Sequence, residues 1–131
     1  MRSPVVTTDF NALVRDVAIL MTTKLIGSII ITKEGVPVGI VTKRDIIQRL
    51  VASCDDPCET KAGEIMSSPL ISTQKERGIL DVMREMRSKA ITQIVIMKGD
   101  EMVGIVSERD LIRAVSVASL ASFSTLLGTK D

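Results

Sequence analysis

An internal repeat constrains the fold of this chain more than any other feature of its sequence. Shifted against itself by 65 residues, the stretch that begins at Ser3 aligns without a gap with the stretch that begins at Ser68. Identities and matched apolar positions continue to the phrases GIVTKRD (39–45) and GIVSERD (104–110). Gapless register over this length indicates that one folding unit is duplicated within the 131 residues.

Each copy predicts the same order of elements, β-α-β-β-α. A short extended piece is followed by apolar residues at positions i, i+3, i+4 and i+7, which predict amphipathic helices near residues 11–23 and 76–88. The runs SIII and IVIM are short and β-branched, as expected for buried strands. Polar turns with glycine lead to second strands, so each copy predicts a hairpin followed by a second helix. The fold class is therefore α+β, with two repeats packed as a pair.

The repeat divides the chain into four segments: repeat 1 (1–53), a polar linker (54–65), repeat 2 (66–120) and a C-terminal tail (121–131). The linker holds both cysteines in the stretch CDDPC. We interpret it as a plain polar linker, with a disulfide or a zinc site as weaker alternatives. In the tail, Leu126 and Leu127 are available to cover either the core or a partner, and the sequence does not choose between these.

Composition narrows the classes of function. The 17 basic and 16 acidic residues argue against a large basic surface for nucleic acid, and two phenylalanines offer few platforms for stacked bases. The chain has no histidine, the commonest general base and metal ligand, so we expect neither an enzyme nor a metal site. No apolar run reaches the length of a membrane span and no signal-peptide pattern is present, so we expect a cytoplasmic protein without a membrane partner.

The candidate binding residues of the sequence lie in the repeated phrase. Thr42 and Ser107 each stand where a strand is expected to end and a helix to begin, and an aspartate follows three residues later, at Asp45 and Asp110. This spacing predicts a capping box, which needs no ligand. The same groups also suit a nucleotide, because a hydroxyl at a helix start can hold phosphate and a carboxylate can accept two ribose hydroxyls. Basic residues stand beside them at Lys43, Arg44 and Arg109.

The whole chain resembles a tandem pair of cystathionine-β-synthase (CBS) domains, also called a Bateman module. The resemblance rests on the two GIV[T/S]xRD phrases, the stretch IMSSPL that opens the second copy, the order of elements and the duplication itself. It implies a pseudo-twofold pair with two related clefts. It also implies binding of AMP, ADP, ATP or S-adenosylmethionine as a regulatory ligand, with no required cofactor. A homodimer and an unknown regulated partner protein are implied as well.

The resemblance further implies which residues bind the ligand. The aspartate of each phrase is expected to hold ribose, the hydroxyl to contact phosphate, and aliphatic residues with backbone from the strand that opens the hairpin to hold adenine. One cleft is expected to contain Thr42, Lys43, Arg44, Asp45, Ile91, Thr92, Gln93 and the entry segment near Ile65 and Met66. The other cleft is expected to contain Ser107, Arg109, Asp110, Ile26, Gly27, Ser28 and Thr92.

The two copies differ in ways that bear on binding. The phrase TKRD has two basic residues, Lys43 and Arg44, whereas in SERD the charge of Arg109 is offset by Glu108. A polyphosphate is therefore expected to prefer the Thr42–Asp45 cleft. KAGEIMS precedes the second copy and only MRS the first, so the wall of the Asp110 cleft is expected to be less complete. The alternative function is a ligand-free structural or dimerisation scaffold, in which both phrases are capping boxes and nothing more.

Overall fold

The computed structural model describes residues 5–116 of the chain, so the predicted tail with Leu126 and Leu127 lies outside the described residues. The chain divides into two compact units, with the boundary between Ile71 and Ser72. The first unit contains most of repeat 1, the linker and residues 66–71 of repeat 2, and the second contains the remainder of repeat 2. Each unit is built around its own three-stranded sheet.

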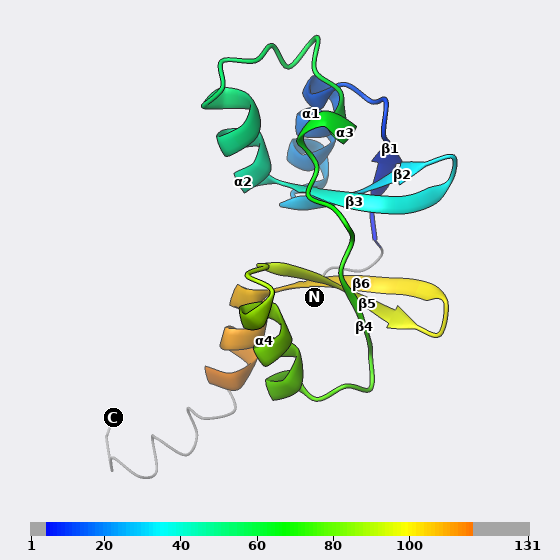
Figure 1. Cartoon of the computed structure of the whole chain (residues 1–131), viewed down its shortest axis with the longest axis vertical. Helices are drawn as coiled ribbons and strands as arrows, with labels where there is room; N and C mark the ends of the chain where they lie inside the picture. The colour runs from blue at the N-terminus through cyan, green and yellow to red at the C-terminus, as the bar shows by residue number, and fades with distance from the viewer. Residues whose placement is uncertain (1–4, 117–131) are drawn as a thin grey trace. The chain divides into compact units, whose positions relative to one another are not determined.

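The first unit has its strands in the order β1-β2-β3, with β1 parallel to β2 and β2 antiparallel to β3. Figure 1 shows α1, α2 and α3 on the same side of this sheet. The elements in chain order are β1 (Thr7–Asp9), α1 (Val14–Lys24), β2 (Ser28–Lys33), β3 (Val36–Thr42), α2 (Lys43–Ile46), the π-helix η1 (Ile47–Val51) and α3 (Ala62–Ile65).

The second unit repeats this arrangement, with strand order β4-β5-β6 and the same pattern of parallel and antiparallel pairs. In Figure 1, α4 and the helical residues 108–116 lie on one side of the sheet. Its elements are β4 (Ser72–Gln74), α4 (Ile79–Ser88), β5 (Gln93–Lys98) and β6 (Glu101–Ser107). The predicted α+β class and the order β-α-β-β-α are therefore confirmed in both copies.

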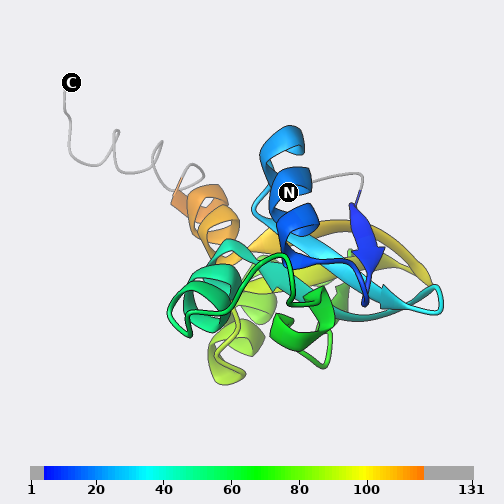
Figure 2. The same cartoon turned by 90° about the horizontal axis from the view of Figure 1, so that it is seen from above.

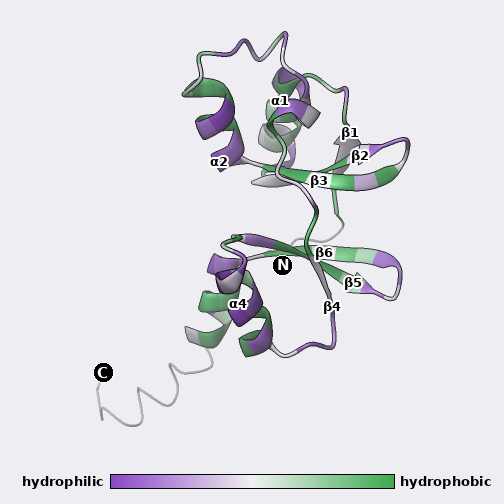
Figure 3. Cartoon of the chain, in the orientation of Figure 1, coloured by the Kyte–Doolittle hydropathy of each residue, from purple (hydrophilic) through white to green (hydrophobic). Residues whose placement is uncertain are grey.

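The two hairpins share their loop length but differ in their turns. In the first, Glu34 and Gly35 are both in the left-handed region, with φ 52° and 79°, whereas in the second the glycine comes first, at Gly99 with φ 61°. The register of each pair shifts at the equivalent place, after Ile31 in β2 and after Ile96 in β5. In Figures 1 and 2 the β2–β3 turn extends away from α1 and α2, and Figure 3 colours the turns of both hairpins as hydrophilic.

The core of the first unit lies between its sheet and its helices. One face of α1 and alternate residues of the strands supply most of it: Val14, Val17, Met21, Ile29, Ile31 and Val41. The short helix α3 completes it, since Ala62 and Ile65 are also buried. Residues 62–65, which the sequence assigned to the linker, thus close the core of repeat 1.

Three helices differ in detail from the sequence prediction, and one of them is α4, which begins at Ile79 where residue 76 was expected. α1 begins at Val14 because residues before it form a turn, in which the backbone N–H of Asn11 donates to the carboxylate of Asp9 at 2.8 Å. The second helix of repeat 1 is α-helical for one turn and then continues as η1. A π-helix is rare and usually brief, and no pattern of apolar residues announces it.

Candidate functional site

The first motif forms the predicted capping box. Thr42 is the last residue of β3 and has extended backbone angles, φ −112° and ψ 166°, while the helix starts at the next residue. The backbone N–H of Asp45 donates to Thr42 Oγ1 at 3.2 Å, and the backbone N–H of Thr42 donates to Asp45 Oδ2 at 2.9 Å. These two hydrogen bonds fix the carboxylate of Asp45 at the junction between β3 and α2.

Asp45 is held by more than its own capping box. Its relative exposure is 6%, and both carboxylate oxygens accept hydrogen bonds. The hydroxyl of Thr42 donates to Oδ2 at 3.1 Å, and the hydroxyl of Ser67 donates to Oδ1 at 3.1 Å. The guanidinium of Arg49 lies 3.8 Å from Oδ1. Each oxygen of the Asp45 carboxylate thus accepts a hydrogen bond from a hydroxyl group of the protein itself.

The entry segment of repeat 2 lies against β3 of repeat 1. Ile40 and Ser67 exchange two backbone hydrogen bonds, of 3.0 and 2.8 Å, and Arg49 donates to the carbonyl oxygen of Met66 at 2.8 Å. A Cβ atom on Gly39 would lie 2.6 Å from Met66 Sδ and 2.8 Å from the carbonyl oxygen of Ser67. The glycine of the first phrase therefore permits the close approach of another part of the chain.

The second motif has the same local geometry. The backbone N–H of Ser107 donates to Asp110 Oδ2 at 3.0 Å, and the backbone N–H of Asp110 donates to Ser107 Oγ at 2.9 Å. Asp110 is half-buried, where Asp45 is buried. Partial burial raises the pKa of the Asp110 carboxyl, whereas the hydrogen bonds with Ser107 lower it. The lowering effects are larger in sum, so the pKa lies below the ordinary value.

The remaining predicted residues divide between the two units. Ile26, Gly27 and Ser28 lie beside the first motif, where the backbone N–H of Lys43 donates to the carbonyl oxygen of Gly27 at 3.1 Å. Beside the second motif lie Ile91, Thr92 and Gln93, the residues that precede and open β5. Each of these segments thus adjoins the motif of its own repeat, and the predicted pairing across repeats stays a prediction.

The basic residues predicted for phosphate are exposed: Lys43, Arg44 and Arg109. A cavity of about 480 Å³ in the first unit is bordered by Lys43 and Ile26, with aliphatic residues from α1 and α2 around them. This cavity places a basic side chain next to an apolar wall.

Two polar residues that contact Asp45 in the structure were not predicted from the sequence. Ser67 and Arg49 correspond to Arg2 and Ala114 in the other copy, so the comparison of repeats gave no signal for either. Ser67 directly follows Met66, which was predicted, and only the fold of the entry segment brings its hydroxyl to the carboxylate.

The expected linker supplies no ligand cluster. Cys54 and Cys58 are exposed and not joined in a disulfide. No group of three or more histidine, cysteine, aspartate or glutamate side chains within residues 5–116 is arranged to hold a metal ion. In the same range, every helix is too short or too polar to cross a bilayer.

Comparison with known proteins identifies relatives of the whole arrangement. The family model of the CBS domain matches residues 1–52 and 62–117. The CBS domain-containing protein YhcV of Bacillus subtilis is 32% identical over 85% of this chain and 79% of its own length. The mitochondrial CBS domain-containing protein CBSX3 of Arabidopsis thaliana is 32% identical over 72% of this chain, which spans about half of that relative (48%). A hexameric CBS-CP12 protein from bloom-forming cyanobacteria has 29% identity and a TM-score of 0.81, covering 91% of this chain and 70% of that one.

Proposed function

Since the chain belongs to the CBS domain family, we propose that it is a non-catalytic regulatory module that binds an adenosyl ligand and alters the contacts of a partner protein. The observation that carries this proposal is the duplicated motif. In each repeat a hydroxyl and a carboxylate are fixed where a strand gives way to a helix, close to exposed basic side chains. A ligand bound there can signal only if it favours one of two states of the protein.

The chemistry of the first motif suits a phosphorylated nucleoside. Lys43 and Arg44 are exposed at the helix start and can pair with phosphate, while the Asp45 carboxylate can accept hydroxyl groups. Ile26 offers an aliphatic wall for a base, beside the same cavity that Lys43 borders. The second motif has Arg109 beside Glu108, so we propose that polyphosphates prefer the first.

Binding at the first motif has an internal competitor. The hydroxyl of Ser67 donates to the Asp45 carboxylate, so it competes with a ribose hydroxyl for the same oxygen. Removing that hydroxyl should therefore favour the ligand. Because a hydrogen bond to a charged group contributes about 1.5–3 kcal/mol and water replaces part of it, we expect Ser67→Ala to tighten binding by roughly tenfold.

The test is calorimetric titration of nucleotide-stripped protein with AMP, ADP, ATP and S-adenosylmethionine. We expect Asp45→Ala to abolish ATP binding, Asp110→Ala to leave it nearly unchanged and Ser67→Ala to tighten it. Ser68→Ala removes the neighbouring exposed hydroxyl and is the matched control for Ser67→Ala. Thermal unfolding of each variant confirms that the fold is intact.

Two results would contradict the proposal in different ways. A greater loss of ATP binding in Asp110→Ala than in Asp45→Ala would move the site to the second motif. No binding of any of the four ligands to folded protein would reject the ligand and leave the alternative, a scaffold in which both motifs only cap helices.

We further propose that the module self-associates. Ile47 and Val51, four residues apart in η1, are each 61% exposed, so two neighbouring aliphatic side chains of one helix form an apolar surface. The similarity to a hexameric CBS-CP12 protein supports assembly of copies of this chain. A homodimer is the simplest assembly that would cover these residues.

A further inference from the structure

The entry segment of repeat 2 is attached to the first motif by side chains as well as by backbone. Arg49 Nη1 donates to the carbonyl oxygen of Met66 at 2.8 Å, and the hydroxyl of Ser67 donates to the Asp45 carboxylate at 3.1 Å. Two backbone hydrogen bonds join Ser67 to Ile40 of β3. Arg49 Nε also lies 3.8 Å from Asp45 Oδ1, so the two side chains that hold the segment contact each other.

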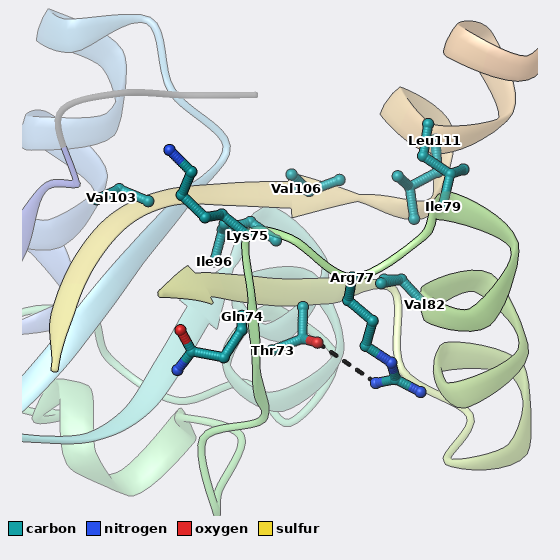
Figure 4. Close-up of a pocket in the computed structure, with 10 residues that line it drawn as sticks. All are labelled: Thr73, Gln74, Lys75, Arg77, Ile79, Val82, Ile96, Val103, Val106 and Leu111. Carbon is teal, nitrogen blue, oxygen red and sulfur yellow. Dashed lines mark hydrogen bonds between the residues drawn. The ribbon is translucent and has the colours of Figure 1, made fainter. Parts of the chain in front are cut away.

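Beyond this attachment the chain passes into the second unit. Residues 68–71 form neither helix nor strand, and the boundary between the compact units falls after Ile71. β4 begins at Ser72 and is held within the second unit. It pairs with β5, and Thr73 Oγ1 accepts a hydrogen bond from Arg77 at 3.3 Å, drawn in Figure 4. This connection is therefore anchored at both ends, and its first end is anchored on the carboxylate of a motif.

The side chains of this attachment are not repeated in the second copy. Ala114 stands at the position of Arg49, and Arg2 at the position of Ser67. The second motif nevertheless forms its own capping box, with hydrogen bonds of 3.0 and 2.9 Å. A capping box therefore needs neither side chain, and Arg49 and Ser67 serve the attachment of the entry segment.

A ligand at the first motif would act directly on this attachment. The hydroxyl of Ser67 and a ribose hydroxyl compete for the same oxygen of Asp45. Ligand binding and attachment of the segment are then linked, and each weakens the other by the same factor. An attached and a released segment are two states between which a regulatory ligand can discriminate.

We propose that residues 66 and 67 are a ligand-operated switch. They are attached to β3 while no ligand holds the Asp45 carboxylate, and they are released when ribose hydroxyls take that carboxylate. This inference rests on the proposed function and adds how the bound ligand changes the protein. It places the change on a stretch of chain that joins the two units.

The test is residue-resolved hydrogen exchange of the full chain, alone and saturated with AMP, ADP, ATP or S-adenosylmethionine. Calorimetry on the same samples shows which of the four is bound. The backbone N–H groups of Ile40 and Ser67 form the bridge and report its opening. We expect the bound ligand to speed their exchange several-fold, because release of the segment exposes them to water. The N–H of Ala62, which donates to Ala12 within the first unit, should not exchange faster.

A variant tests the attachment without any ligand. Arg49→Met keeps a long side chain and removes its donors. In ligand-free protein it should speed exchange at Ile40 and Ser67 by roughly tenfold, the effect of losing one hydrogen bond from a charged donor. Gln48→Met is the matched control, because Gln48 is the preceding exposed residue of η1 and makes none of the hydrogen bonds of the attachment.

The possible failures are distinguishable. A ligand that binds without speeding exchange at Ile40 and Ser67 rejects the switch and leaves the ligand proposal standing. Equal exchange in Arg49→Met and Gln48→Met also rejects the switch, because something other than Arg49 then holds the segment. If none of the four ligands binds to folded protein, the ligand proposal and the switch are rejected together.

Discussion

Asp45 and Asp110 occupy the same position of the same motif, and their surroundings give them different roles. Asp45 is buried and accepts hydroxyl hydrogen bonds from Thr42 and Ser67. Asp110 is half-buried, and bonding to Ser107 keeps its pKa low. A carboxylate stabilised in its charged form at a helix start contributes to stability only while it is ionised.

The pH dependence of this contribution can be predicted for Asp110. Its pKa is lowered from 3.8 in the folded protein, so its contribution is fully present above about pH 4 and is lost as the pH falls through the folded value. Asp110→Asn should therefore destabilise the protein at neutral pH, by about 0.3–1 kcal/mol for the loss of a negative charge at a helix start. Urea unfolding followed by circular dichroism measures the difference.

The decisive observation is how the difference in unfolding free energy between the natural chain and Asp110→Asn changes as the pH is lowered. It should shrink below about pH 4, because the unfolded state then takes up the proton before the folded state does. Asp100→Asn, in the exposed turn between β5 and β6, removes a carboxylate that caps no helix and serves as the control. A difference that stays constant down to pH 3 would show that the charge of Asp110 contributes nothing to stability.

At the scale of elements, α3 belongs to repeat 1 although it precedes repeat 2 in sequence. Its backbone is joined to the start of the first unit by hydrogen bonds from Ala62 to Ala12 and from Gly63 to Phe10. Ile65 is 2% exposed, and the ring of Phe10 leaves no room for a side chain at Gly63. A helix of four residues has little stability of its own, so this packing is what holds it.

Truncating the buried side chain of α3 should destabilise the first unit. Ile65→Ala is expected to cost about 2–5 kcal/mol, the usual range for a large-to-small change in a core. Leu80→Ala removes the same number of carbons from an exposed position of α4 and should cost less than about 1 kcal/mol. Chemical unfolding of both variants measures the costs, and similar values would mean that α3 does not close the core.

For the whole molecule, two similar units leave aliphatic surface uncovered in different places. The first unit exposes Ile47 and Val51 on η1, and the second leaves Ile79 of α4 44% exposed. Surface of this kind is usually covered by another part of the chain or by another molecule. We assign the η1 surface to a second copy of this chain.

Self-association through η1 can be tested by placing a charge on it. Val51→Glu should weaken the assembly by at least roughly tenfold, because a charged side chain would be buried in the interface without a partner. Sedimentation velocity over a range of concentrations measures this. Leu80→Glu, at an exposed aliphatic residue of α4, should leave the assembly unchanged. If both variants dissociate equally, or neither does, the interface does not include η1.

Much of the fold and part of the candidate site follow from sequence alone, because the signals are local. The gapless repeat established the duplicated β-α-β-β-α unit, and the spacing Thr42-x-x-Asp45 established a capping box within one helical turn. Apolar periodicity placed the helices and hairpins to within a few residues. The start of η1 and the helix at 62–65 were missed, since short elements depend on contacts more than on pattern.

Only the tertiary structure decided how the equivalent positions differ. Ser67 reaches Asp45 across 22 residues of sequence, and Arg49 reaches the carbonyl oxygen of Met66 across 17. Neither contact has a periodic or repeated signal, because the other copy holds different residues at those positions. Val14 and Ile79 occupy equivalent positions of the repeat. α3 helps to bury Val14, whereas among the described residues Ile79 stays 44% exposed. Local sequence sets which elements form, whereas burial depends on which distant segment packs against them.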